Sequence, residues 1–203
     1  MANPAPLQHG SYYHIYNRGV NRENLFVEER NYRYILQLYA RHIEPIAETY
    51  AYCLLRNHFH FLVWIKDLTG LRRTEGSHDL TGLKKPSQYF SNFFNAYTKA
   101  FNKAFDRTGT LFQRPFGRIA VTSDAYLAWL VVYIHQNPEK HGFVDDFRAW
   151  PYSSYHAHLS DKPTRLQRDE VLDWFHGEEG LVMAHRQVVE VGRLAPLVPD
   201  DFE

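Results

Sequence analysis

The chain of 203 residues has one cysteine, no net charge and no long apolar run. Because Cys53 has no second cysteine to pair with, an internal disulfide is excluded. No stretch resembles a signal peptide or a membrane span, so we expect a cytoplasmic protein that does not act in a membrane. Hydrophobic residues make up 44% of the sequence, which favours a packed domain over a disordered chain.

Charge is balanced in total but not along the chain. Lys and Arg number 23, as do Asp and Glu, so net charge gives no argument for a nucleic-acid partner. From Lys66 to Arg118 there are ten basic and four acidic residues, whereas Asp161 to Glu203 contain five basic and ten acidic ones. A basic middle followed by an acidic end suits a phosphate-contacting surface, and it also suits ordinary solvated faces.

Runs of strand formers and helical spacing predict the elements of the first half. Residues 11–16 form the first predicted strand, and apolar residues at near-helical spacing predict a helix over residues 27–43. Residues 48–55 and 58–65 are two further strand-like runs with only two residues between them. Such a short connection indicates an antiparallel hairpin.

The second half continues this alternation. A helix is predicted over residues 86–105, then a strand over residues 116–122. The last helix begins at Ser123 or Asp124 and is expected to stop near Pro138. The resulting order favours an α+β fold, with an antiparallel sheet of split βαβ type, two helices on one face and a third helix.

Two segments fall outside this pattern. Residues 67–85 contain two near-copies, Asp67-Leu-Thr-Gly-Leu-Arg-Arg73 and Asp79-Leu-Thr-Gly-Leu-Lys-Lys85, which we interpret as an inserted basic loop. The secondary-structure signal weakens near the C-terminus. We therefore predict a main domain of residues 1–158, followed by a helical and extended appendage of residues 159–203.

The segment from His58 to Phe61 carries the clearest chemical signal. Side chains alternate along a strand, so His58 and His60 project from one face, and Phe59 and Phe61 from the other. Two imidazoles at one place suit a shared ligand such as a divalent metal ion. The alternative at this point is a pair of histidines on a solvated strand face.

Two other groups are weaker metal candidates. Cys53 would complete a zinc site with the hairpin histidines, but structural zinc sites usually need four protein ligands, so a buried free cysteine is the favoured interpretation. His156 and His158 form a second His-x-His pair. They lack a flanking apolar strand run, and we expect them on an irregular surface segment.

Tyr133 and Asn137 are four residues apart in the last predicted helix and so share one helix face. A free tyrosine has a pKa of about 10, so it needs a nearby cation to act as a nucleophile at neutral pH. The amide oxygen of Asn137 would be a third ligand beside two imidazoles. That set suits Mg²⁺ or Mn²⁺ and does not exclude Zn²⁺. Taken alone, Tyr133 is better explained as a helix tyrosine packed on the sheet.

Three ordered motifs resemble a known family. His58-Phe59-His60 and Tyr133-Ile-His-Gln-Asn137-Pro-Glu-Lys-His-Gly142 resemble the single-tyrosine HUH transposases. Trp150-Pro-Tyr-Ser-Ser-Tyr155 looks especially like the REP-associated tyrosine transposases of that family. The resemblance extends over about residues 9–158, which makes the main domain the expected catalytic domain.

This resemblance implies a ferredoxin-like core in which His58 and His60 bind the metal, with Asn137 at the third-ligand position. Tyr133 would attack a DNA phosphodiester, forming a covalent 5′-phosphotyrosine and a free 3′-hydroxyl, and the reverse attack would reseal the strand. The implied substrate is single-stranded DNA with hairpin or palindromic elements. The implied enzyme is a monomer or a homodimer that binds DNA in the nucleoid.

Phosphate contacts are expected from clustered basic residues. The candidates are Arg18, Arg72, Arg73, Lys84, Lys85, Arg114 and Arg118.

Two other readings stay open. The first is a catalytically inactive ferredoxin-like module that binds nucleic acid without forming an adduct. The second is a metal-dependent phosphodiesterase in which water rather than Tyr133 attacks.

Overall fold

The computed structural model describes residues 5–67 and 84–187. Four strands, six α-helices and two short 3-10 turns occur in these ranges. The strands are β1 (Ser11–Arg18), β2 (Ala47–Leu54), β3 (His58–Ile65) and β4 (Gly117–Val121). The helices are α1 (Glu29–His42), α3 (Pro86–Ala104), α4 (Asp124–Lys140), α5 (Tyr155–His158), α6 (Arg168–Trp174) and α7 (Glu178–Ala184), with 3-10 turns at Val20–Arg22 and Phe147–Ala149.

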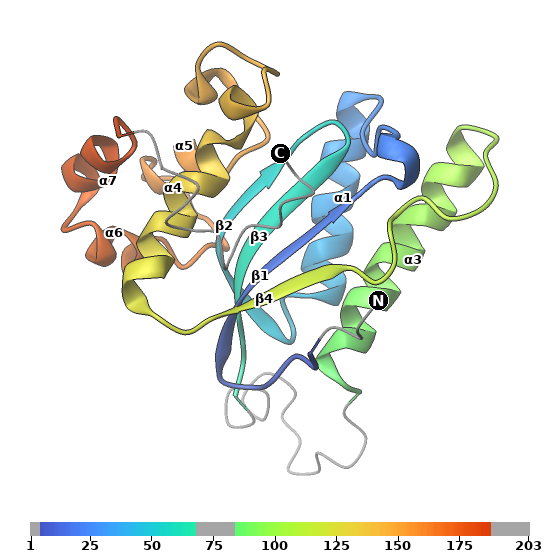
Figure 1. Cartoon of the computed structure of the whole chain (residues 1–203), viewed down its shortest axis with the longest axis horizontal. Helices are drawn as coiled ribbons and strands as arrows, with labels where there is room; N and C mark the ends of the chain where they lie inside the picture. Colours follow the sequence, from blue (N-terminus) through green and yellow to red (C-terminus); the bar gives the residue numbers. More distant parts are fainter. Residues whose placement is uncertain (1–4, 68–83, 188–203) are drawn as a thin grey trace.

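The strands form one antiparallel sheet in the order β2-β3-β1-β4. Helices α1 and α3 pack together on one face, and α4 lies across the other face with α5 to α7 beside it (Figure 1). The predicted α+β fold of split βαβ type is therefore confirmed. β3 is an inner strand, and helices cover both faces of the sheet. Side chains of β3 are therefore buried whichever face they point from.

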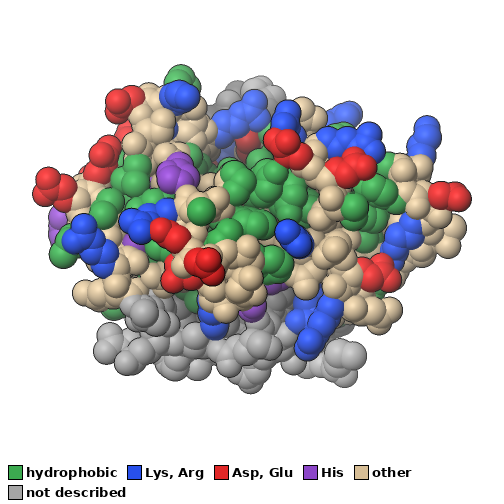
Figure 2. Space-filling model, turned by 90° about the horizontal axis from the view of Figure 1, so that it is seen from above, with side chains coloured by type: hydrophobic (Ala, Val, Ile, Leu, Met, Phe, Trp, Pro, Cys, Tyr) green, Lys and Arg blue, Asp and Glu red, His purple; other side chains and the backbone are tan. Residues whose placement is uncertain are grey.

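The surface carries both signs of charge. On the face in Figure 2, Lys and Arg side chains are interspersed with Asp and Glu side chains around exposed hydrophobic groups. The balanced composition is thus not separated into a basic and an acidic half on that side. None of the described helices is long and apolar enough to cross a bilayer.

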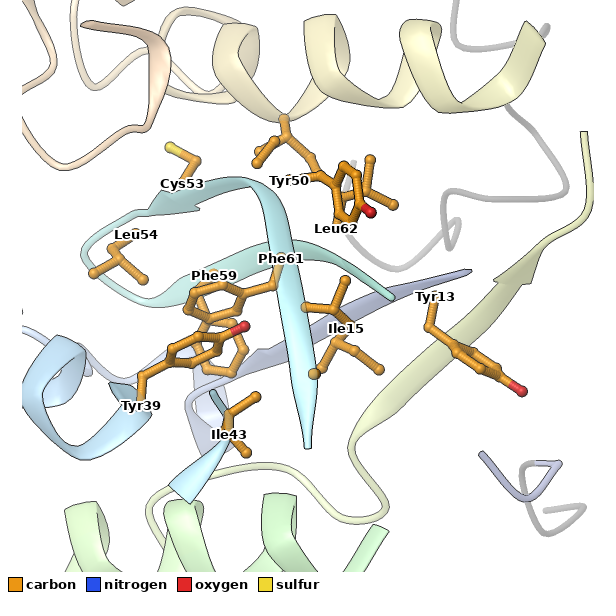
Figure 3. Close-up of a cluster of buried hydrophobic side chains, with 14 of the residues drawn as sticks. Tyr13, Ile15, Tyr39, Ile43, Tyr50, Cys53, Leu54, Phe59, Phe61 and Leu62 are labelled. Atoms are coloured by element: carbon orange, nitrogen blue, oxygen red, sulfur yellow. The ribbon is translucent and has the colours of Figure 1, made fainter. Parts of the chain in front are cut away.

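The strand alternation sorts the core into two layers. Phe59, Phe61 and Ile15 point toward α1, whereas Cys53 and Leu62 point toward α4 (Figure 3). All five are almost completely buried. Cys53 is a free buried thiol, as predicted, and burial raises its pKa well above the ordinary value.

The segment after residue 158 packs on the sheet rather than standing apart. The amide of Gln167 donates to the carbonyl oxygen of Thr49 at 2.9 Å, beside the edge strand β2. Tyr50 donates from its hydroxyl to Glu170 Oε2 at 3.0 Å, and its ring stacks on Trp174 with centroids 5.1 Å apart. The boundary predicted at residue 158 stays a prediction.

Helix α4 ends near Pro138, as expected, with its last residue at Lys140. Its last turn is held by bonds from the amide of His141 to the carbonyl oxygen of Asn137 and from the amide of Phe143 to that of Pro138. Proline removes only its own N–H donor, so it is tolerated one turn before the helix end.

One local expectation is wrong, and it concerns His156 and His158. They lie on the short helix α5 rather than on an irregular segment, and although His156 is exposed, His158 is completely buried. The ring of His158 lies 5.5 Å from that of His135 on α4. Packing of α5 against α4 therefore buries a residue that lacks apolar neighbours in sequence.

Candidate active site

His58 and His60 occupy adjacent inward positions at the start of β3. Their neighbours on β1 are Arg18, opposite His58, and Tyr16, opposite His60. Both imidazoles are buried, with 5% and 0% of their surface exposed. Strand alternation brings the two rings to the face covered by α4, as predicted, and their centroids are 5.3 Å apart.

Each of these rings is held through its Nδ1 atom. His58 Nδ1 lies 2.7 Å from Asn57 Oδ1, and since an amide oxygen only accepts, the imidazole donates. His60 Nδ1 lies 2.9 Å from His14 Nε2. A neutral His58 that donates from Nδ1 carries its lone pair on Nε2, the atom that can coordinate a cation.

The surroundings keep both rings neutral. Burial, followed by repulsion from His141 and Arg18, lowers the pKa of His58 to about 3. Burial, followed by the neighbouring His14 and His58, holds the pKa of His60 well below its ordinary value. Neutral imidazoles are the form that binds metal ions.

Helix α4 adds a tyrosine and an asparagine to this place. The ring of Tyr133 lies 5.8 Å from that of His60 and 6.3 Å from that of His14. Asn137 Nδ2 donates to the Tyr133 carbonyl oxygen one turn earlier, at 2.7 Å. Lys140 Nζ lies 5.4 Å from the centre of the Tyr133 ring, so a positive charge is close to the phenol. One chain thus brings all four predicted residues together.

Three of the four residues, His58, His60 and Asn137, carry atoms of the kinds that ligate a divalent cation. Among residues 5–67 and 84–187, no group of three or more His, Cys, Asp or Glu side chains is arranged for a metal ion. The set here is instead two imidazoles and an amide. Asn137 is fully buried, and its Oδ1 has no hydrogen-bond partner among the described residues. An orphaned buried acceptor costs free energy, and a cation ligated by that oxygen removes the cost.

Sequence reasoning missed two histidines of this site. His14 on β1 is fully buried against His60, and the His141 ring lies 4.8 Å from that of His58. His141 follows Asn137 by four residues, a spacing that was visible but lay beyond the expected helix end. His14 gives no local signal, because its position depends on the pairing of β1 with β3.

The predicted DNA-contacting residues are not gathered in one patch. Arg18 lies opposite His58, whereas Arg114 and Arg118 line a groove beside α3. Lys84 and Lys85 are exposed immediately before α3. The remaining two candidates, Arg72 and Arg73, lie outside the described residues.

The fold and the site define a ferredoxin-like α+β protein with a buried pair of histidines facing a helix-borne tyrosine. No protein-family model matches the chain. Over 116 residues it is 31% identical to a protein of Haemophilus influenzae provisionally described as a REP-associated tyrosine transposase. That match covers 54% of this chain and 59% of the relative, less than two thirds of the relative's length.

A solved structure gives a second likeness. It is described as a REP-associated tyrosine transposase bound to a REP hairpin, and it shares the fold with a TM-score of 0.57 at 20% identity. The superposition covers 88% of this chain and 96% of that chain. The resemblance carried by the sequence motifs is thereby confirmed: the chain is similar in sequence to one protein described as a REP-associated tyrosine transposase, and in fold to a solved one.

Proposed function

We propose that the chain is a divalent-metal-dependent transposase-like enzyme that nicks and rejoins single-stranded DNA through Tyr133. The observation that carries the proposal is the meeting of His58, His60, Tyr133 and Asn137, with the buried Asn137 Oδ1 lacking a hydrogen-bond partner among the described residues. Relationship to a REP-associated tyrosine transposase supports the same class of activity.

In this proposal His58, His60 and Asn137 hold Mg²⁺ or Mn²⁺, which supplies charge stabilisation to the scissile phosphate. Asn57 and His14 orient the two imidazoles through their Nδ1 atoms. The positive charge of Lys140 near the Tyr133 ring favours the phenolate and the incoming phosphate.

Tyr133 Oη attacks phosphorus, and the bond from phosphorus to the 3′ oxygen breaks. A 5′-phosphotyrosine and a free 3′-hydroxyl result, and the proton lost by the phenol balances the one taken up by the 3′ oxygen. The reverse attack restores the strand without another energy source.

The substrate we propose is a single strand with a hairpin, because the solved relative is described as bound to a REP hairpin. The test incubates the protein with Mn²⁺ and labelled hairpin DNA from the region flanking its gene, followed by electrophoresis in denaturant. A protein–DNA adduct is expected from the native chain and from Tyr126→Phe, a control tyrosine on the same helix. Tyr133→Phe is expected to form none.

The other outcomes identify the alternatives. A free 5′-phosphate that persists in Tyr133→Phe would establish hydrolysis by water. Hairpin binding without any adduct, across Mg²⁺ and Mn²⁺, would establish a module that binds DNA without cleaving it. Chelation of the metal is expected to abolish the adduct in the proposed mechanism.

A further inference from the structure

A groove of about 330 Å³ lies between α3 and residues 110–118. Polar side chains recur along the α3 wall at spacings of three or four residues, so they share one helix face. Two arginines lie on the other wall. The residues concerned are Ser87, Ser91, Asn95 and Thr98 on the helix, and Arg114 and Arg118 opposite.

Aromatic rings form the floor of this α3 groove. Phe94 lies 5.1 Å from Phe112 and 5.3 Å from Phe116 between ring centroids, and all three rings line the groove. The guanidinium carbon of Arg118 lies 4.8 Å from the centre of the Phe116 ring. Stacking on that ring favours a fixed plane for the guanidinium. The floor is therefore apolar and aromatic, with the Phe94 ring inclined by 50° to that of Phe112 and by 59° to that of Phe116, and the walls are polar.

The charge of the groove has one sign. No Asp or Glu is among the described residues that line it. Arg114 is exposed, and its Nη2 lies 3.3 Å from Asn95 Oδ1 on the opposite wall. At one end Lys84 and Lys85 precede the first turn of α3, where the helix dipole is also positive. An anionic ligand would meet positive charge from the two arginines of the groove and from the lysines before α3.

The groove is connected to the candidate active site through the end of β1. The amide of Gln113 in the groove wall donates to the carbonyl oxygen of Arg18 at 2.9 Å. Arg18 is the β1 residue paired with His58. A strand of DNA at the histidines can thus reach the groove around the end of β1 rather than through the sheet.

We propose that the α3 groove holds an unpaired nucleotide of the DNA strand on which the site acts. Arg114 would contact its phosphate, while the amide and hydroxyl groups of α3 contact the edge of its base over the aromatic floor. An acidic peptide would use the arginines, but it would leave the aromatic floor and the row of hydrogen-bonding side chains without a role. The inference rests on the proposed function, because it names where the substrate's unpaired flank binds.

The test measures binding by fluorescence anisotropy in EDTA, so that no cleavage contributes. Two labelled DNAs are compared: a hairpin with unpaired flanks taken from the region around the gene, and its blunt-ended stem. The variants are Arg114→Gln, which removes a phosphate contact, and Asn95→Asp, which places a negative charge in the groove. Both positions are exposed, so the fold is expected to persist. Lys103→Gln, exposed on α3 outside the groove lining, is the charge-matched control.

Each groove variant is expected to bind the flanked hairpin about tenfold more weakly. Arg114→Gln loses one charge-assisted hydrogen bond, and Asn95→Asp adds repulsion between its carboxylate and the phosphate. Binding of the blunt stem and of the control variant should stay unchanged. For Arg114→Gln, the dependence of log affinity on log salt should fall by about 0.7, the value for one phosphate contact to a single strand.

Unchanged binding of the flanked hairpin in both variants overturns the proposal, and so does an equal loss for both DNAs. These failures are separate from failure of the proposed function. If the native chain forms an adduct while the groove variants bind normally, only the groove assignment is wrong. If no adduct forms but tighter binding of the flanked hairpin than of the blunt stem depends on Arg114 and Asn95, the groove assignment stands and the catalytic proposal is wrong. Failure of the native chain to bind either DNA overturns both.

Discussion

His14 Nε2 and His60 Nδ1 are 2.9 Å apart, and the two rings stack with centroids separated by 5.1 Å. For His60 to ligate a cation through Nε2, its Nδ1 must carry the proton and donate it to His14. His14 is therefore a positioning residue, which fixes the orientation and the tautomer of the proposed ligand.

His14→Ala is expected to weaken Mn²⁺ binding about 10- to 100-fold, because the bond that orients the imidazole is lost. His14→Gln keeps an acceptor within reach and should recover part of the affinity. Electron paramagnetic resonance of free Mn²⁺ during titration gives the dissociation constant directly.

His156→Ala is the control, because His156 is exposed on α5. The positioning role is wrong if His14→Ala binds Mn²⁺ as tightly as the native chain while its thermal unfolding is unchanged. A general loss of stability without rescue by glutamine would identify His14 as a packing residue only.

Acid should destabilise the protein through histidines remote from the hairpin. These histidines are His158 and His185. Burial lowers the pKa of each to about 4, and for His158 the nearby His185 contributes to this lowering. In the unfolded chain histidine titrates near 6.5, so as pH falls the unfolded state binds these protons first. Stability is thus complete above about pH 6.5 and is lost between about 6.5 and 4, by about 1.4 kcal/mol per pH unit for each histidine.

Urea unfolding at a series of pH values measures this slope. His158→Leu removes one titrating group from a completely buried position and is expected to flatten the slope by about one proton. His156→Leu, at an exposed position, should leave it unchanged. A slope that is the same in His158→Leu and the native chain would contradict the assignment.

How far the sequence predicts this molecule depends on which contacts are local. The hairpin of β2 and β3 was predictable because strand alternation and a short connection are local features. The pairing of His58 with His60 followed from the same alternation. His14 could not be placed, because its contact with His60 comes from the register between β1 and β3, which are far apart in sequence.

The ends of elements were harder to predict than their centres. His141 shares a helix face with Asn137, but Pro138 was expected to end the helix between them. The burial of His158 depends on contacts with α4, and the residues next to His158 in sequence give no indication of them. Both residues are placed by packing rather than by local propensity, which is why composition and spacing missed them.

Gly117 is expected to resist substitution because of the ring of Tyr16. A Cβ at Gly117 would lie 2.0 Å from that ring, whose centroid is 6.3 Å from that of His60. Gly117→Ala must therefore displace Tyr16 or the edge strand β4. We expect a loss of about 1–3 kcal/mol in the free energy of unfolding, together with reduced adduct formation.

The double variant Tyr16→Ala, Gly117→Ala isolates this clash. If steric overlap with the ring is the cause, adding Gly117→Ala to a chain that already carries Tyr16→Ala should cost much less than adding it to the native chain. An equal cost in both backgrounds would place the requirement for glycine in the backbone of β4 instead. Denaturant unfolding of the four proteins completes the cycle.

Asn137 offers the sharpest separation of metal binding from packing. Its amide nitrogen is bonded to the Tyr133 carbonyl oxygen, whereas its buried oxygen has no hydrogen-bond partner among the described residues. Asn137→Leu fills a similar space without a ligand atom and is expected to weaken Mn²⁺ binding at least tenfold. Asn137→Asp loses the amide donor but keeps an oxygen that a divalent cation prefers, so Mn²⁺ should bind at least as tightly as to the native chain.

The two variants also predict opposite effects of Mn²⁺ on stability. Without metal, Asn137→Asp places a buried charge beside β3 and should unfold at lower temperature than Asn137→Leu. Mn²⁺ at a concentration above the Kd of Asn137→Asp and below that of Asn137→Leu should raise the unfolding temperature of the first variant and leave that of the second nearly unchanged, because only the first is then occupied. If Mn²⁺ stabilises both variants equally, Asn137 is not a ligand, and His141, next to His58, becomes the residue to test in its place.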